Sequence, residues 1–457
     1  MIKFLHMSDV HLGCRRYNLE ERTKDFFRSW HDVITRHALP SGVDFVLIAG
    51  DFFDRRNIDP QTMNHALAGL QLLKDAGIPV VAIEGNHDRR DAVSPYSWMR
   101  SFSQAGFMIL LEPTSDEANP ISLVPWDEES RSGSYVDIKG ARIFGTHWYG
   151  TSANAAMTIL ADALRGARDE GLFHILLLHT DVEGQLNRPI PALSVEKLKE
   201  LRLLVNYVAL GHTHKRFEVE NWAFNPGSLE ACSIDEYREE RGLYLVEVDD
   251  ADHVSATFIN DYVQRPFQRL TFDVSGVEDP KAVHAGVMEM IKREARVHDP
   301  ESDSPAPIIE INLRGHLGFK NSNLDLRSMR EEALTETGAL HVMLKNQSVP
   351  VEYAVAAGLD ADTSRAYRER RIVEDLIARD TRYRDRAPEM AELVLEAKRR
   401  ALSDEPPEVI LELIEQKIEP RTRDDNAAAA TEVGAAPSPS ALDALERSAT
   451  TAATSDN

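Results

Sequence analysis

Short apolar runs alternate with amphipathic stretches along roughly the first 265 residues of the chain. The runs have the length of buried strands and cover residues 2–7, 45–49, 80–83, 141–144, 175–178 and 205–210. Residues 19–39, 60–76 and 151–170 repeat apolar side chains at helical spacing. Alternating strands and helices predict an α/β layered domain.

The pattern changes near Pro266, where three further strands and two helices are predicted. The strands cover residues 268–274, 308–313 and 340–344, and the helices cover about residues 279–294 and 325–336. This order predicts a first domain over residues 1–265 and a second, smaller α/β unit over residues 266–350.

Residues 351–420 are predicted to form a linker and then helices only. Three helical stripes of apolar side chains occur after residue 364, with prolines at the breaks between them. Three short, highly charged helices bury little apolar surface, so they form a small bundle, pack on the rest of the chain or dock on a partner. Residues 421–457 are rich in Ala, Ser, Thr and Pro and are predicted to be a disordered tail.

Composition and charge limit the classes of protein that the chain can represent. Its 457 residues contain no apolar run as long as a membrane span, and the N-terminus lacks the pattern of a signal peptide, so we expect a cytoplasmic protein. The two cysteines do not suggest a disulfide framework or a zinc knuckle. The net charge of −23 argues against a protein that coats nucleic acid. It does not exclude a nucleic-acid enzyme, because bound cations or a partner subunit can supply positive charge.

Side chains that can bind metal ions follow five of the predicted strands. They occur in the segments Ser8-Asp9-Val10-His11, Gly50-Asp51-Phe52-Phe53-Asp54, Gly85-Asn86-His87-Asp88, His179-Thr180-Asp181 and Gly211-His212-Thr213-His214. Basic pairs follow four of these segments, at Arg15-Arg16, Arg55-Arg56, Arg89-Arg90 and Lys215-Arg216. Because functional groups in open α/β sheets gather at the carboxyl ends of the strands, we expect the five loops to converge on one edge.

The side-chain types in these loops indicate a pair of metal ions. Two carboxylates, one amide oxygen and four imidazoles, without a cysteine thiolate, suit Mn, Fe or Zn, and the share of oxygen ligands favours Mn. Seven ligands are too many for one ion, whereas a bridging aspartate would give each of two ions four protein ligands. Two ions about 3.5–4 Å apart can activate a hydroxide and hold a phosphoryl group during in-line displacement.

These motifs resemble those of the calcineurin-like metallophosphoesterase superfamily, in the set DVH, GDFFD, GNHD, His179 and GHTH. Longer segments resemble its SbcD-type branch of DNA double-strand-break repair nuclease subunits, namely MSDVHLG, VLIAGDFFDRRN, YVALGHTHKRFEV and NPGSLE. The resemblance covers about residues 1–245 by motif and residues 266–420 by architecture. It implies an α/β fold with a β-sandwich flanked by helices (αββα), a small α/β capping domain and a C-terminal helical segment that docks on an ATPase.

The resemblance also implies a role for each residue of the clusters. One ion would be held by Asp9, His11, Asp51 and His214, and the other by Asp51, Asn86, His179 and His212, with Asp51 as the bridge. His87 matches a histidine that binds no metal and either stabilises charge in the transition state or protonates the leaving oxygen. Asp88 is expected to orient His87. Asp54 stands where family members differ, so no role is implied for it.

The residues and the resemblance together lead to three hypotheses of function. The first is an Mn-dependent DNA nuclease in DNA repair, an exonuclease on duplex ends and an endonuclease on single strands or hairpins, which acts as a homodimer with an SbcC-like ATPase bound to residues 364–420. The second is a metallophosphoesterase for small phosphodiesters such as cyclic nucleotides, which the acidic net charge favours and the additional domains disfavour. The third, a scaffold without activity, is disfavoured because the set of ligands is complete.

Two further histidines and two aromatic residues have more than one interpretation. His6 lies within the first predicted strand, and we expect it to pack in the core. His147 ends another predicted strand and either faces the cleft or packs against its surroundings, with the packed interpretation favoured. Tyr96 and Trp98 either join the core or stack on a base, and the sequence favours neither.

Overall fold

The computed structural model of the protein describes residues 1–90, 94–115, 119–186, 192–349, 364–378, 380, 382–403 and 405–417. The chain divides into two compact units, Met1–Pro350 and Val351–Asn457. The first unit contains three sheets, and the described part of the second contains helices. Among the helices of the described residues, none is both long and apolar enough to cross a membrane.

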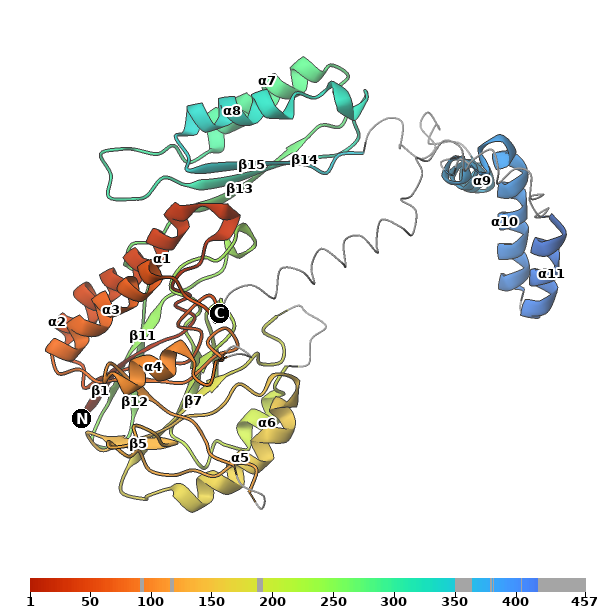
Figure 1. The fold of residues 1–457 in the computed structure, drawn as a ribbon. Coiled ribbons are helices and arrows are strands. Elements are labelled where there is room, and N and C mark those ends of the chain that lie inside the picture. Colours follow the sequence, from red (N-terminus) through yellow and green to blue (C-terminus); the bar gives the residue numbers. More distant parts are fainter. Residues whose placement is uncertain are drawn as a thin grey trace, which may run out of the picture. The chain divides into compact units, whose positions relative to one another are not determined.

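Two six-stranded sheets make up most of the first unit (Figure 1). The first has the order β12-β11-β1-β2-β3-β4, with β1 (Ile2–Met7), β2 (Phe45–Ile48), β3 (Val80–Ala82), β4 (Ile109–Leu110), β11 (Leu243–Val248) and β12 (Val254–Ile259). The second has the order β5-β6-β7-β8-β10-β9, with β5 (Tyr135–Ile138), β6 (Ala141–Phe144), β7 (Phe173–His179), β8 (Tyr207–Gly211), β9 (Phe217–Val219) and β10 (Ala223–Asn225). Strands β1 to β4 are parallel, as are β6 to β8, so each set ends at a common edge.

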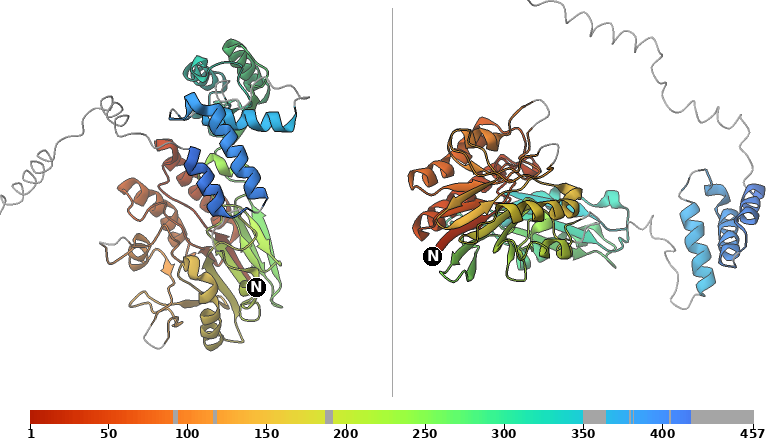
Figure 2. Two further views of the ribbon diagram at one scale, coloured as in Figure 1. Left: turned by 90° about the vertical axis from the view of Figure 1, so that its right-hand side faces the viewer. Right: turned by 90° about the horizontal axis from the view of Figure 1, so that it is seen from below.

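The two sheets pack against each other, and helices cover their outer faces (Figures 1 and 2). Phe4 and Leu47 of the first sheet lie in one buried cluster with Leu177 and Tyr207 of the second. The outer face of the first sheet packs on α1 (Glu20–Val33), α3 (Pro60–Asp75) and α4 (Trp98–Gln104), and that of the second on α5 (Ala153–Ala167) and α6 (Val195–Lys199). The predicted αββα fold class is confirmed.

The predicted elements of this domain occur with shifted ends. The predicted helix over residues 19–39 is α1 followed by a π-helical turn (Ile34–Ala38) and the short α2 (Leu39–Ser41). Strand β8 begins two residues later than predicted, because Val205 instead closes a helical turn by donating its N–H to the Leu201 carbonyl. The sequence pattern missed β4, β5 and β9 to β12. Strands β4, β9 and β10 have only two or three residues, and β5 and β12 are edge strands with partly exposed side chains, whereas β11 is a largely buried internal strand of six residues.

A smaller parallel sheet follows the two large ones in the segment predicted to be a capping domain, which we call the capping region. It consists of β13 (Phe267–Asp273), β14 (Ile308–Arg314) and β15 (His341–Asn346), and α7 (Pro280–Glu294) and α8 (Leu326–Thr337) pack on one of its faces (Figure 1). Arg265 stands just before β13 and donates from Nε to the buried Asp25 carboxylate of α1 at 2.6 Å. Arg22 donates to the same oxygen at 2.6 Å, so a buried charge network joins α1 to the start of the capping region.

The second unit contains three helices in the described residues, α9 (Arg365–Ile377), α10 (Ala387–Leu402) and α11 (Pro407–Lys417). Helix α10 packs on both α9 and α11. Of the described residues here, only Ala387, Met390 and Ala391 are buried. Residues 351–363 and the predicted disordered tail over residues 421–457 lie outside the described residues. The predicted domain boundaries after residues 265, 350 and 420 stay predictions.

Candidate metal centre

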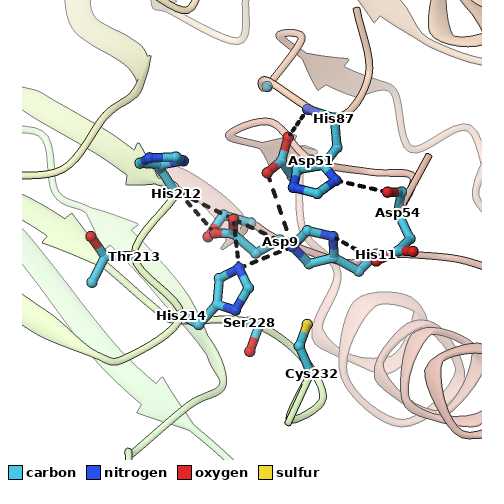
Figure 3. Close-up of polar contacts among 12 residues, drawn as sticks. Asp9, His11, Asp51, Asp54, His87, His212, Thr213, His214, Ser228 and Cys232 are labelled. Atoms are coloured by element: carbon cyan, nitrogen blue, oxygen red, sulfur yellow. Dashed lines mark hydrogen bonds and ion pairs between the residues drawn. The ribbon is translucent and has the colours of Figure 1, made fainter. Parts of the chain in front are cut away.

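Five loops bring the predicted ligands together at the carboxyl ends of β1, β2, β3, β7 and β8 (Figure 3). The loops after β1, β2 and β3 carry Asp9, His11, Asp51 and Asn86, the end of β7 carries His179, and the loop after β8 carries His212 and His214. The first three strands are neighbours in one sheet, and the other two are neighbours in the second. The centre therefore lies where the edges of the two packed sheets meet.

One group of side chains surrounds the Nε2 atoms of His11 and His214 (Figure 3). These two ring nitrogens are 3.0 Å apart. An oxygen of Asp9 is 3.9 Å from His11 Nε2 and 3.8 Å from His214 Nε2, and Asp51 Oδ2 is 4.0 Å from His11 Nε2. These are the four side chains that the resemblance assigns to one ion.

A second group surrounds the Nε2 atom of His179. This nitrogen is 3.3 Å from Asp51 Oδ2, 3.3 Å from Asn86 Oδ1 and 3.2 Å from His212 Nδ1. Asp51 Oδ2 therefore faces both groups, while its Oδ1 accepts a hydrogen bond from the His87 backbone N–H at 2.9 Å. The backbone contact fixes the carboxylate in the orientation that a bridging ligand needs.

The other ring nitrogen of each histidine faces an oxygen acceptor. His179 Nδ1 lies 2.8 Å from the Ala49 carbonyl, and His214 Nδ1 lies 3.0 Å from Glu236 Oε1. His11 Nδ1 is 3.8 Å from Asp54 Oδ1, and His212 Nε2 is 3.5 Å from Asp181 Oδ2. Of these four contacts, those of His179 and His214 are hydrogen bonds, whereas His11 Nδ1 and His212 Nε2 lie farther from their carboxylates. Metal-binding histidines in proteins are commonly held by such a hydrogen bond, with the other nitrogen free to bind the ion.

The side chains of the centre suit divalent cations because their lone pairs point toward one another. His179 Nδ1 donates its proton to a carbonyl, so its Nε2 carries a lone pair that faces the oxygens of Asp51 and Asn86. Such an arrangement is repulsive unless a cation or a proton stands between the acceptors. Burial alone would keep His179 neutral, but the Asp51 carboxylate raises the pKa of His179 to about 9. His179 therefore gains a proton where no cation is bound.

The backbone at the centre is strained, as is common at functional sites. Asp9, His11, Asp51 and His212 have φ values of 51°, 48°, 50° and 90°, in the region that favours glycine. Gly85 has no room for a side chain, because a Cβ there would overlap the Asp51 carboxylate and its backbone nitrogen. The glycine of the GNHD motif thus lets the loop after β3 approach the bridging aspartate closely.

The structure corrects the predicted contact between Asp88 and His87. His87 Nδ1 lies 2.7 Å from the Asp54 carbonyl, so the backbone of Asp54 orients the ring. The buried Asp88 carboxylate instead accepts hydrogen bonds from the backbone N–H groups of Phe52, Phe53 and Gly85 at 2.9–3.1 Å. These contacts of Asp88 join the loops after β2 and β3. Burial and the Asp51 carboxylate raise the pKa of Asp88 to about 8.

Arginines surround the opening of the centre. A cavity of about 460 Å³ is lined by Arg15, Arg16 and Arg55 together with His11, His87 and His214. A second cavity of about 640 Å³ is lined by Arg55 and Arg56 beside Asn86 and His87. The other basic pairs differ, since Arg216 is bonded to Glu218 and Glu240, and Arg89 lies over the Trp148 ring at 5.7 Å.

The remaining candidates lie outside the centre. His6 is buried, with Nδ1 2.9 Å from the Tyr207 hydroxyl and Nε2 3.0 Å from the Leu210 carbonyl, which confirms it as a core residue. His147 Nε2 is 3.0 Å from the Pro113 carbonyl. Trp98 packs against the core under α1 and α3, whereas Tyr96 is exposed.

Sequence reasoning missed Glu236 and the supporting role of Asp181. Glu236 lies 22 residues after His214 in a segment without a metal motif, and only the fold brings its carboxylate to the imidazole. Asp181 stands two residues after His179, yet it supports His212 and accepts a hydrogen bond from Thr213 Oγ1 at 2.8 Å. The only local indication in the sequence is the segment His179-Thr180-Asp181, which does not show that Asp181 faces His212.

Comparisons with known proteins match residues 2–216 to the calcineurin-like phosphoesterase family. The chain is 26% identical over 369 residues to the DNA double-strand break repair protein Mre11 of Aeropyrum pernix, which covers 78% of this chain and 82% of that protein. It is 31% identical over 253 residues to the protein of the same name from Archaeoglobus fulgidus, over 52% of this chain and 54% of that protein. Among solved structures, the calcineurin-like phosphoesterase YfkN from Bacillus subtilis superimposes with a TM-score of 0.36 at 13% identity, covering 64% of this chain and 97% of that chain.

Proposed function

We propose that the chain, whose residues 2–216 match the calcineurin-like phosphoesterase family, is a DNA nuclease that hydrolyses phosphodiester bonds with two divalent cations. The observation that carries the proposal is the sharing of Asp51 Oδ2 between two groups of ligands, 3.3 Å from His179 and 4.0 Å from His11. The similarity to archaeal proteins named for DNA double-strand break repair supports DNA as the substrate.

Each residue of the centre has a defined part in this reaction. Asp9, His11, Asp51 and His214 would hold one cation, and Asp51, Asn86, His179 and His212 the other. When bound, the two cations polarise the phosphodiester and lower the pKa of the attacking water. His87 binds neither cation in this scheme. The Asp54 carbonyl holds its Nδ1, which leaves Nε2 to stabilise charge on the phosphate or to protonate the leaving oxygen.

The basic residues at the opening support a polyanionic substrate. The chain as a whole has a net charge of −23, which disfavours sequence-independent binding along a duplex. Arg15, Arg16, Arg55 and Arg56 are nevertheless exposed and line the cavities that lead to His87. We therefore assign them to phosphate contacts beside the cleaved bond.

Manganese and an ATPase partner complete the proposal. The mixture of imidazole, carboxylate and amide ligands favours Mn²⁺. Helices α9 to α11 expose apolar side chains, including Leu376 at 49% and Leu402 at 76% exposure. These side chains support docking of an SbcC-like coiled-coil ATPase on residues 364–420. Residues 418–420 of this segment lie outside the described part. We further propose a homodimer that works in the cytoplasm, as an exonuclease on duplex ends and an endonuclease on single strands or hairpins.

The test compares DNA with small phosphodiesters in one preparation of the full-length protein. End-labelled duplex, hairpin DNA, bis(p-nitrophenyl) phosphate and a cyclic nucleotide are each incubated with Mn²⁺. We expect cleavage of both DNA substrates, and no cleavage of DNA by the wild-type protein would contradict the proposal. Turnover of the cyclic nucleotide without DNA cleavage would establish the alternative, a small-molecule phosphodiesterase, which the net charge of −23 favours.

The role of His87 is tested with His87→Ala. We expect a loss of roughly 100-fold to 10,000-fold in turnover, as for other general acids, with both cations still bound according to metal analysis. The matched control is His147→Ala, because His147 also lies in a loop after a strand but bonds the Pro113 carbonyl. Full activity of His87→Ala would show that this mechanism is wrong.

A further inference from the structure

The only two cysteines of the chain lie together in the wall of the cleft. Cys14 follows β1, and Cys232 follows β10, 218 positions later in the sequence. Both line the cavity of about 460 Å³ that also contains His11 and His214. Cys14 lies in the hydrophobic cluster under α1 and α3, and Cys232 packs against the same cluster. The fold has therefore paired two thiols that the sequence keeps far apart.

The two thiols lie near each other in the wall of this cavity. The Cys14 thiol lies within hydrogen-bonding reach of the Cys232 thiol, and this contact, together with burial, raises the pKa of Cys232. The Cys232 sulfur also lies within 4.8 Å of ligand nitrogens of His11 and His214. Figure 3 shows the Cys232 side chain directed toward these two rings.

Hydrogen bonds hold the backbone on both sides of the pair. The Cys14 N–H donates to the His11 carbonyl at 3.1 Å, and the Cys14 carbonyl accepts from Thr23 Oγ1 at 3.5 Å. The Cys232 N–H donates to Glu236 Oε2 at 2.9 Å, and the other oxygen of Glu236 faces His214. Cys14 is thus anchored to His11 itself, and Cys232 to Glu236, which faces His214.

From this juxtaposition we propose that Cys14 and Cys232 are a site of reversible oxidation, at which a peroxide joins them in an intramolecular disulfide. Cys232 meets the peroxide first because it is only partly buried, although its raised pKa keeps most of it in the thiol form. Cys14 is 4% exposed and acts second. The Cys232 sulfur attacks the O–O bond of hydrogen peroxide, which forms a sulfenic acid and releases one water. The Cys14 sulfur then attacks the oxidised sulfur, the S–S bond forms and a second water leaves. Two thiols lose two hydrogens and two electrons, and the peroxide is reduced to two waters.

The arrangement favours a bond within one chain. Cys14 is too deeply buried to meet a thiol of another molecule, and the chain offers no third cysteine. The disulfide would join the loop that carries His11 to the loop that carries Glu236. This inference stands on the contact between the thiols and does not depend on the proposed nuclease activity.

The experiment exposes the full-length protein, with the metal that it carries as purified, to hydrogen peroxide. We expect the intact mass to fall by about 2 Da for the loss of two hydrogens, and the thiols that react in denaturant to fall from two to none. Digestion should yield one peptide pair that links Cys14 to Cys232. Dithiothreitol should restore both the mass and the two thiols.

The matched variants are Cys14→Ser and Cys232→Ser, each of which should show no loss of 2 Da and no linked peptides. Three results with the wild-type protein would overturn the proposal. They are oxygen addition of about 16 or 32 Da without a crosslink, disulfide-linked dimers on a non-reducing gel, and two intact thiols after an exposure that oxidises a free dithiol. The peptide map of the wild-type protein shows whether Cys14 and Cys232 are linked, even where a variant folds poorly.

Discussion

The sheets of the phosphoesterase domain and the C-terminal helices use apolar side chains in opposite ways. All seven residues of β7 are buried, and three hydrophobic clusters fill the space between and outside the two large sheets. In α9, by contrast, none of the described side chains is buried, and Ile372 and Leu376 are 39% and 49% exposed. A continuous core holds the first region, whereas the second presents much of its apolar surface to water.

This difference in packing decides which region can hold a strained backbone. The centre keeps Asp9, His11, Asp51 and His212 at positive φ, which costs roughly 1–3 kcal/mol for each residue. Only a well-packed surrounding structure can hold such a backbone, and the clusters beneath the loops supply it. The helices have no comparable support, so their apolar stripes are suited to binding a partner.

The largest effect is expected for Asp51→Asn. This change removes the charge that faces both groups of ligands, so we expect a loss of about 4 kcal/mol in catalysis, or about a thousandfold. Metal analysis should show fewer bound cations. The control is Asp44→Asn, because Asp44 stands directly before β2 as Asp51 stands after it, and accepts a hydrogen bond from the Lys3 N–H. Unchanged metal content in Asp51→Asn would contradict the bridging role.

Gly85→Ala tests whether close packing holds the centre. The new Cβ would overlap the Asp51 carboxylate, so we expect a loss of roughly 1–3 kcal/mol in the free energy of unfolding together with weaker metal binding. Gly166→Ala is the matched control, because a Cβ at this position in α5 meets nothing within 4 Å. The control should gain roughly 0.5–1 kcal/mol. Thermal unfolding of both variants measures the difference, and equal stabilities would refute the close approach.

Glu236→Gln tests the support that sequence reasoning missed. The carboxylate faces His214 Nδ1 at 3.0 Å and is also bonded to Arg241 at 3.1 Å. Neutralising it should weaken metal binding by roughly 10- to 100-fold, as for other partners of ligand histidines. Titration with Mn²⁺ in a calorimeter measures the dissociation constant. The control Glu239→Gln, three residues away, should bind Mn²⁺ as tightly as the wild type does. An unaltered Mn²⁺ dissociation constant for Glu236→Gln would exclude a role of Glu236 in supporting His214.

Protonation of His6 should affect stability only in acid. Burial lowers the pKa of His6 from 6.5 to about 3, whereas the unfolded chain binds a proton near pH 6.5. The unfolded state therefore binds more protons between these values, so stability falls as the pH falls, by up to about 1.4 kcal/mol per pH unit. His6→Gln should show a shallower decline in denaturant titrations between pH 6.5 and pH 4. His253→Gln, with a side chain 81% exposed, should decline as the wild type does, and equal slopes for His6→Gln would refute the prediction.

The smallest effect on hydrolysis is expected in the C-terminal helices. Leu376→Glu places a charge on an apolar stripe, so DNA cleavage by the protein alone should change by less than about twofold, within the usual range for surface substitutions. Binding of the coiled-coil ATPase, measured by co-purification of the two proteins, should be lost. Leu203→Glu, at a position 86% exposed in the phosphoesterase domain, should retain both properties. A large loss of hydrolysis in Leu376→Glu would show that hydrolysis also depends on the C-terminal helices.

Much of the fold and the centre could be predicted because the signals are local. Each ligand stands within a few residues of a strand end, as Asp51 does after β2 and Asn86 after β3. The carboxyl ends of parallel strands share an edge, so the loops within each sheet had to meet. The packing of the two sheets then brought the two sets of loops together. The shortest strands could not be predicted, because β9 and β10 have three residues each, too few to show a periodicity.

The sequence by itself determined the α/β class, the seven candidate ligands and the buried place of His6, because these depend on residue type and on short-range pattern. The tertiary structure alone decided which atoms meet. It placed His11 against His214 across 203 positions, gave Asp88 to three backbone amides instead of His87, and brought Glu236 and the Cys14–Cys232 pair to the same wall of the cleft. Contacts between residues so far apart depend on how the sheets pack, and no local pattern records that packing.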